Sequence, residues 1–318
     1  MRLPDPCGRL TGHLFPSLRS DGRETAVPVT VEPDSTHDEQ LALWVLYELH
    51  YRGFDDVSAE LEWEPWVLTV RQQLEASFEQ RLRSTCVVPD GLDPAAPVGE
   101  TLFALVDAHP GTSVAAHVGG RADLATVEDL LRQRSLYHLK ESDPVAWSVP
   151  RLPPAAQARL MELQFDEYGA GDPDRLHASL FARGLRQAGL DDAYGAYVGE
   201  TTVEALEQNN AMSLFGLHRR HLGAAMGHLA AFEASSSLPS RRMAKGLRRV
   251  GITGDLAAYY DEHVEADAVH EQLAARGICG ALVAEQPELA PDVLWGAQVC
   301  LDLEHRFAEA MLSRWAAA

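Results

Sequence analysis

The sequence predicts an all-α protein built as a helical bundle. Apolar residues recur at spacings of three and four along most of the chain, as one buried face of a helix requires. Alternation with a period of two, which marks a half-buried strand, is almost absent, and "TSVAAHV" (112–118) is the best strand candidate. With 46% apolar residues, the 318-residue chain can form one large core or two smaller ones.

The helical pattern begins after an N-terminal stretch, residues 1–36, that has no clear period and is expected to form an arm. Two Pro-rich stretches, "VVPDGLDPAAPVGE" and "ESDPVAWSVPRLPP", interrupt the pattern, because proline cannot continue a helix. Between and after these breaks we expect helices over 38–54, 66–84, 99–109, 123–138, 154–168, 173–188, 201–219, 220–235, 240–249, 255–276 and 284–315.

The net charge and the spacing of the cysteines argue against several classes of partner and of site. The net charge is −20, from 47 acidic and 27 basic residues, so the phosphates of a nucleic acid or an anionic membrane would be repelled. The four cysteines are far apart and form no CxxC pair, which argues against a disulfide framework or a thiolate zinc site. We find neither a signal peptide nor an apolar run of the ~20 residues that a membrane span needs, so we expect a cytoplasmic protein.

The segment "HVEADAVH" (263–270) is the first candidate for chemistry. In a helix its offsets of four and seven place His263, Asp267 and His270 within ~60° of one another, over ~10 Å of axis. These side chains fall near the expected buried stripe, where ionisable groups are costly unless paired, and imidazole and carboxylate bind iron, manganese or zinc. The alternative is a solvated face of charge pairs, which is the commoner origin of such an isolated pattern.

A second cluster lies in "LMELQFDEYGAGDPDRLHASLF" (160–181), where Glu167 ends one expected helix and His177 begins another. On a straight helix the two would point in different directions. The glycines of "GAGDP" permit a bend across which the side chains can converge. The alternative is an ordinary helix–turn–helix in which Asp172 or Asp174 caps the second helix.

A third candidate is Glu233, a lone carboxylate in the otherwise uncharged "HLAAFEASS" (228–236), which needs a partner if it is buried. His218, His221 and His228 are rival ligands on the same stretch. His221 follows two arginines and is expected on a polar face. His228 is expected to be a satisfied or solvent-exposed histidine, or at most an outer partner of a site.

Taken together, "DEYGAGDPDRLH" (166–177), "GHLAAFE" (227–233) and "HVEADAVH" resemble the haem-oxygenase-like diiron oxidases, the iron-containing redox enzyme family. The resemblance spans about residues 130–280. It implies a haem-oxygenase-like helical bundle with additional N-terminal helices, binding two non-haem irons instead of haem. The paired Glu-x-x-His motifs of ferritin-like bundles are absent.

Carried over by position, the resemblance implies a set of metal-binding and catalytic residues: Glu167, His177, Glu233, His263, Asp267 and His270. Glu141, in "YHLKESDP" (137–144), stands where some family members add another carboxylate ligand; the alternative is a surface residue before the Pro-rich loop. Tyr168 and Tyr260 adjoin ligands and are interpreted as packing residues, outer partners or a redox relay. Residues 126–318 would then form the diiron domain, and 37–125 an accessory helical region that caps the site or mediates dimerisation.

The function that the resemblance implies is O₂-dependent oxidation of a small organic molecule, with two irons as cofactor, O₂ as co-substrate and an unidentified electron donor. Manganese–iron also fits these ligands. We expect N-oxygenation or oxidative cleavage of an amine or amino acid in specialised metabolism. Alternatives are a fatty-acid decarboxylase or desaturase on the same site, a metal-free thiaminase-like enzyme, and a helical binding protein. A thiaminase-like enzyme needs a nucleophilic cysteine, and Cys279 follows the last motif most closely.

Overall fold

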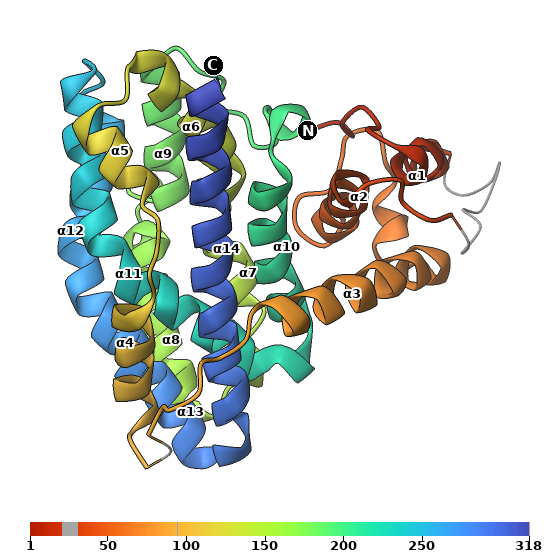
Figure 1. The fold of residues 1–318 in the computed structure, drawn as a ribbon. Helices are drawn as coiled ribbons and strands as arrows, with labels where there is room; N and C mark the ends of the chain where they lie inside the picture. The colour runs from red at the N-terminus through yellow and green to blue at the C-terminus, as the bar shows by residue number, and fades with distance from the viewer. Residues whose placement is uncertain (21–30, 94, 318) are drawn as a thin grey trace.

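The protein is a bundle of helices, seen in a computed structural model that describes residues 1–20, 31–93 and 95–317, but not the side chains of 265–268. Every regular element in these ranges is helical, so the all-α prediction is confirmed. The bundle (Figure 1) contains α6 (Leu124–His138), α8 (Pro154–Glu167), α9 (His177–Gln187), α10 (Val203–Leu217), α11 (Leu222–Arg249), α12 (Asp255–Gln272) and α14 (Ala290–Ala317).

Short helices connect these elements. They are η1 (Ala59–Trp63), α7 (Asp143–Ala146), η2 (Val149–Arg151), η3 (Gly169–Gly171), η4 (Val198–Glu200), η5 (Arg219–His221), the π-helix η6 (Leu273–Cys279), α13 (Gly280–Glu285) and η7 (Pro287–Leu289). None of the helices in the described ranges is long and apolar enough to cross a membrane.

Helix α11 is the central element of the bundle. It packs against α12, α14, α5 (Val114–Gly120) and α4 (Val98–Ala108). Its small residues let α14 approach so closely that a Cβ added to Gly227 would lie 1.8 Å from the carbonyl oxygen of Val293. The absence of a side chain at this position therefore sets the distance between the two longest helices.

The N-terminal helices form a separate group beside α10 (Figure 1), made of α1 (Arg9–Arg19), α2 (Thr36–Glu48) and α3 (Pro65–Thr85). Helix α1 lies inside the stretch expected to be an arm. It is tied to α2 by the buried Asp38, whose carboxylate accepts hydrogen bonds from the N–H groups of Leu10 and Thr11 at 2.8 and 2.9 Å. A carboxylate at this place satisfies the unpaired first N–H groups of α1.

The strand candidate and one pair of expected helices differ from the structure. The strand candidate 112–118 is wrong, because residues from Val114 onward form α5, whose first turn is capped by Ser113. The two helices expected over 220–235 and 240–249 are one helix, α11, which runs through Pro239. Proline costs a helix interior about 3 kcal/mol, and the burial of α11 against its neighbours outweighs that cost.

The predicted boundary between an accessory region and a diiron domain near residue 125 stays a prediction. Helices α4 and α5 lie on the N-terminal side of that boundary, yet both pack against α11. Helices α1–α3, by contrast, stand to one side of the bundle (Figure 1).

The ion pair of Arg134 in α6 with Glu304 in α14 links two helices of the bundle through bonds of 2.7 and 2.6 Å. Burial raises the pKa of Glu304, but Arg134 outweighs it and the net pKa is lowered. The pair therefore stabilises the fold fully above the unfolded pKa of ~4.3, and this stabilisation is lost as the pH falls through the lower folded value.

We expect Glu304→Gln to cost about 2 kcal/mol at neutral pH, less than a fully buried pair because the side chains are 16% and 32% exposed. The cost should shrink as the pH falls toward about 3, as urea unfolding at both pH values would measure. Glu309→Gln, on an exposed site of the same helix, is the control. An equal cost of Glu304→Gln at both pH values would contradict this account.

Candidate metal centre

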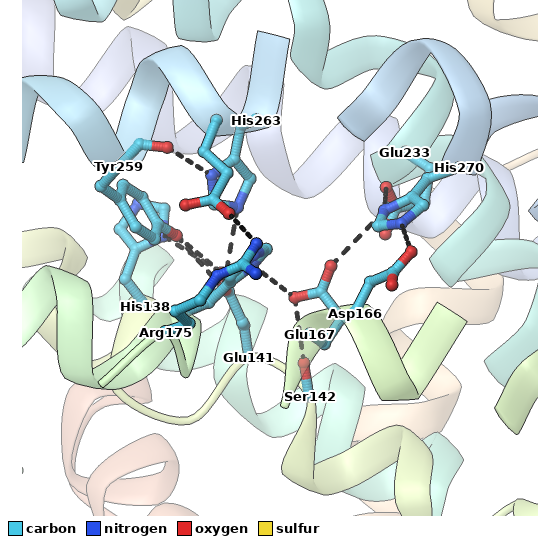
Figure 2. Close-up of polar contacts among 12 residues, drawn as sticks. His138, Glu141, Ser142, Asp166, Glu167, Arg175, Glu233, Tyr259, His263 and His270 are labelled. Atoms are coloured by element: carbon cyan, nitrogen blue, oxygen red, sulfur yellow. Dashed lines mark hydrogen bonds and ion pairs between the residues drawn. The ribbon is translucent and has the colours of Figure 1, made fainter. Parts of the chain in front are cut away.

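Six of the predicted site side chains converge inside the bundle, where they form two clusters of possible metal ligands (Figure 2). In each cluster the ligand atoms lie within 4.8 Å of one another. The first cluster consists of Glu141, Glu167, His177 and His263, and the second consists of Glu167, Glu233 and His270. Glu167 belongs to both, and in Figure 2 it lies between the groups around His263 and His270.

The bend between α8 and α9 brings Glu167 and His177 together, as the glycines of this segment predict. Gly169 has a φ of +71°, and a Cβ there would lie 2.5 Å from the backbone nitrogen of Leu176. Glu167 is the last residue of α8 and His177 the first of α9. Across the bend, His177 Nδ1 lies 2.9 Å from Glu167 Oε2.

Helix α12 supplies His263 and His270, which are only 9% and 2% exposed. A solvated face is therefore wrong for these two histidines. His263 Nδ1 lies 2.7 Å from the backbone oxygen of Tyr259, and donation of that proton leaves Nε2 as the nitrogen that can bind a metal. The side chain of Asp267, between them, is outside the described residues, so its role as a ligand stays a prediction.

Glu233 finds its partner in the second cluster. Its Oε2 lies 3.6 Å from His270 Nδ1, and Glu167 Oε1 lies 3.5 Å from the same nitrogen. The other ring nitrogen, Nε2, is 3.3 Å from Asp166 Oδ2. One imidazole nitrogen thus faces two buried carboxylates while the other is oriented by a third, which is the arrangement of a metal-binding histidine.

The buried carboxylates and imidazoles of the two clusters shift one another's pKa values. Burial raises the pKa of Glu141 to about 7, with the Glu167 charge adding to the effect. Burial opposes protonation of His177, but Glu167 outweighs it and raises the pKa to about 9. For His270, Glu233 likewise outweighs burial, and the pKa is about 9. Glu167, beside these imidazoles, has a lowered pKa because they outweigh its own burial.

These donor sets fit iron. His177 Nδ1 is buried and within 2.9 Å of a carboxylate oxygen, yet the two atoms lack hydrogen-bond geometry. This nitrogen therefore faces the space shared with Glu141 and Glu167 without a hydrogen bond of its own among the described residues. Three carboxylates and three imidazoles around that space offset most of the charge of two divalent cations, and both ligand types suit iron.

Glu141 has outer partners that sequence reasoning missed. Its side chain is 9% exposed, so it lies inside the bundle and not on the surface. The Tyr259 hydroxyl lies 3.0 and 3.2 Å from its two oxygens and 2.9 Å from His138 Nδ1. Burial, with a contribution from Arg134, lowers the pKa of His138 to about 3, so the ring is neutral. The spacing of Tyr259 four residues before His263 was the available signal.

Comparison with known proteins agrees with this geometry. The sequence model of the iron-containing redox enzyme family matches residues 128–305, more than half of the chain and all of both clusters. The chain belongs to the iron-containing redox enzyme family. This confirms the resemblance drawn from the motifs and assigns the protein to a family of oxidoreductases.

One sequence relative supports the family, and one solved structure supports the fold. Over 162 residues the chain is 30% identical to nitrosourea synthase from Streptomyces achromogenes subsp. streptozoticus, which covers 50% of this chain and 34% of that protein. The chain thus spans about a third of the length of this relative. A CADD-like protein of unknown function from Nostoc punctiforme superposes with a TM-score of 0.51 at 15% identity, over 76% of this chain and 98% of that one. It confirms the haem-oxygenase-like fold.

The rival histidines of this family member lie outside both clusters. His218 pairs with Glu75 at 2.8 Å and His221 with Glu79 at 3.3 Å. His221 is 2% exposed, so its expected place on a polar face is wrong, because helix α3 packs a carboxylate onto it. His228 is also buried and not exposed.

The two neighbouring tyrosines differ in their surroundings. Tyr168 is 39% exposed, and its hydroxyl donates to Asp143 at 2.8 Å. Tyr260 is buried, and its hydroxyl lies 3.4 Å from His138 Nε2. Tyr260 therefore contacts an outer partner of Glu141, whereas the Tyr168 hydroxyl is bonded to Asp143, which belongs to neither cluster.

One cavity of this iron-containing redox enzyme adjoins the clusters, and a second lies nearby. One, of about 50 Å³, touches Glu141, Glu167, Glu233 and His263, and its other walls are largely apolar. The second, of about 530 Å³, lies farther along α11. Phe232 lines both cavities. The second has the size of a site for a small organic molecule.

Proposed function

We propose that this protein is an O₂-dependent non-haem diiron oxygenase that acts on a small amine or amino acid in specialised metabolism. The observation that supports this most strongly is the pair of buried donor clusters that share Glu167. A carboxylate with one oxygen toward each cluster is suited to bridging two ions. Its Oε2 faces His177, and its Oε1 faces His270.

Within this proposal, His177 and His263 would hold one ion together with Glu141, and His270 and Glu233 would hold the other. Two bound ferrous ions would supply two of the four electrons that reduce O₂ and leave coordination positions open for it. Tyr259 and His138 orient Glu141, and Asp166 orients His270. The 50 Å³ cavity beside three of the carboxylates has largely apolar remaining walls.

The reaction balances as a single turnover. An amine and O₂, with two electrons from the metal centre and two protons, give a hydroxylamine and water. The amine supplies the remaining two electrons as its nitrogen is oxidised. Repeated turnover needs an external one- or two-electron reductant, such as a reduced flavin or an iron–sulfur protein.

An amine is favoured over a fatty acid by two observations. The relative's name, nitrosourea synthase, denotes a product that contains an oxidised nitrogen. In addition, the net charge of −20 attracts cationic molecules more than carboxylates. Fatty-acid decarboxylation or desaturation on the same clusters remains the second candidate within the family.

A metal-free thiaminase-like reaction finds no support in the described part of the chain. None of the cysteines lines either cavity. Cys279 is fully buried with its thiol toward the backbone oxygen of Met226, and burial raises its pKa to about 12. A thiol with that pKa is a poor nucleophile at neutral pH.

The proposal is tested by O₂ uptake. Protein reconstituted anaerobically with Fe(II) is mixed with O₂ and with matched panels of amines, amino acids and fatty acids. We expect an amine or amino acid to accelerate O₂ consumption at least ~10-fold and to gain one oxygen atom, as isotope-labelled O₂ and mass spectrometry would show. Acceleration by fatty acids alone, with release of CO₂, would favour the second candidate and reject the first.

A further inference from the structure

Helix α2, which lies outside the part of the chain that matches the family, contacts the turn that carries Glu141. The turn between α6 and α7 contains Lys140, whose side chain is 1% exposed and forms an ion pair with the fully buried Glu48 near the end of α2. Lys140 precedes Glu141 directly. These two adjacent residues of one turn are thus buried in different places: Lys140 lies against α2, and Glu141 lies in the first cluster.

Further contacts with the N-terminal helical region hold the same turn. The Tyr194 hydroxyl donates to Glu48 Oε1 at 2.7 Å, and the Lys140 ammonium lies 4.3 Å from the centre of the Tyr51 ring. Arg52, just after α2, donates to the backbone oxygen of Leu139 at 2.6 Å. The backbone on the N-terminal side of Glu141 is therefore held by side chains from residues 48–52.

The stability of the fold alone does not require the ion pair between Glu48 and Lys140. Two charges removed from water cost several kcal/mol, and a well-packed apolar pair is often as stable. What a buried pair does provide is a defined position, since moving Lys140 would leave the buried Glu48 carboxylate without a positive charge, with only the Tyr194 hydroxyl beside it. The position of Lys140 in turn limits where the backbone of Glu141 can lie.

We propose that Glu48 is a positioning residue for the metal centre: with Lys140 it clamps the turn so that Glu141 reaches the first cluster. The N-terminal helices then position a metal site whose described ligands, Glu141 included, all lie within the matched family region. The inference rests on the proposed metal centre. It also predicts that the two clusters respond differently, because the second cluster contains no residue of this turn.

The test measures Co(II) affinity at one cluster at a time. In a His270→Ala background only the first cluster remains complete, and in a His263→Ala background only the second does. Visible absorption during anaerobic Co(II) titration gives each Kd. Glu48→Ala, which leaves Lys140 buried without its carboxylate, should weaken the first cluster ~10-fold or more, the range seen when outer partners of metal ligands are lost. The second cluster should change less than ~2-fold.

Two further variants separate positioning from general stability. Asp38→Ala weakens the contact between α1 and α2 without touching the turn, so it should lower Tm yet leave both Co(II) affinities unchanged. Glu48→Gln combined with Lys140→Met removes both charges but keeps their volumes and an acceptor for Tyr194, so it should restore the affinity of the first cluster.

Should Glu48→Ala fail to fold, Arg52→Met serves instead, because Arg52 is 41% exposed and its loss removes the bond to Leu139. Arg52→Met should also lower the Co(II) affinity of the first cluster. Unchanged Co(II) affinity at the first cluster in whichever variant folds would overturn the clamp while leaving the proposed function intact. No Co(II) uptake by the unsubstituted protein would instead reject the metal centre, and the clamp with it.

Discussion

Replacing Glu167 with alanine is expected to abolish metal binding at both clusters, whereas replacing Glu233 should abolish it at only one. Glu167 is the single described residue common to the two donor sets. Its removal also takes away the negative charge that faces His177 and His270 at 2.9 and 3.5 Å. We expect at least a ~100-fold loss of Fe(II) affinity at each position, beyond the effect of losing an outer partner.

The measurement is anaerobic Fe(II) titration followed by metal analysis of the desalted protein. Glu162→Ala is the matched control, since Glu162 is exposed on the same helix and should retain the full metal content. If Glu167→Ala kept one tightly bound ion, Glu167 would belong to a single site, and the two clusters would not form one dinuclear centre.

The largest effect on stability is expected at the contact between α11 and α14. Gly227→Ala would place a methyl group 1.8 Å from the backbone oxygen of Val293, and backbone atoms of a packed helix cannot move aside cheaply. Overpacking of this kind typically costs 1–3 kcal/mol, and we expect about 3 kcal/mol or more here. For a chain of this size that corresponds to a fall in Tm of roughly 6–12 °C.

Gly280→Ala is the matched control for Gly227→Ala. Gly280 has helical backbone angles, and an added Cβ would meet no atom within 4 Å. It should stabilise the protein by about 0.5–1 kcal/mol, because alanine loses less conformational freedom than glycine in a helix. A Tm for Gly227→Ala equal to that of the unsubstituted protein would show that the two helices can separate without cost.

Much of the site could be predicted because its signals are local. The three-and-four spacing placed His263 and His270 on one stripe, and the glycines after Glu167 indicated the bend that brings His177 back. The structure shows both features. Glu233 could be singled out because its own segment contains no other carboxylate, lysine or arginine. Its partner His270 could be named only through the family resemblance, because the pairing joins two helices.

The parts that were not predicted depend on contacts between distant segments. Nothing near Lys140 in the sequence indicates that its partner is Glu48, 92 residues away. The two arginines before His221 suggested a polar face, but the packing of α3 buries that histidine. The continuity of α11 through Pro239 likewise results from tertiary burial that overrides a local helix-breaking signal.

The central claim, that one chain places two irons on either side of Glu167, is tested most directly by anomalous X-ray diffraction at the iron edge. Crystals grown from anaerobically Fe(II)-loaded protein should show two strong peaks. One should lie among Glu141, Glu167, His177 and His263, and the other among Glu167, Glu233 and His270. A single peak contacting only one cluster, or peaks confined to surface carboxylates, would contradict the account.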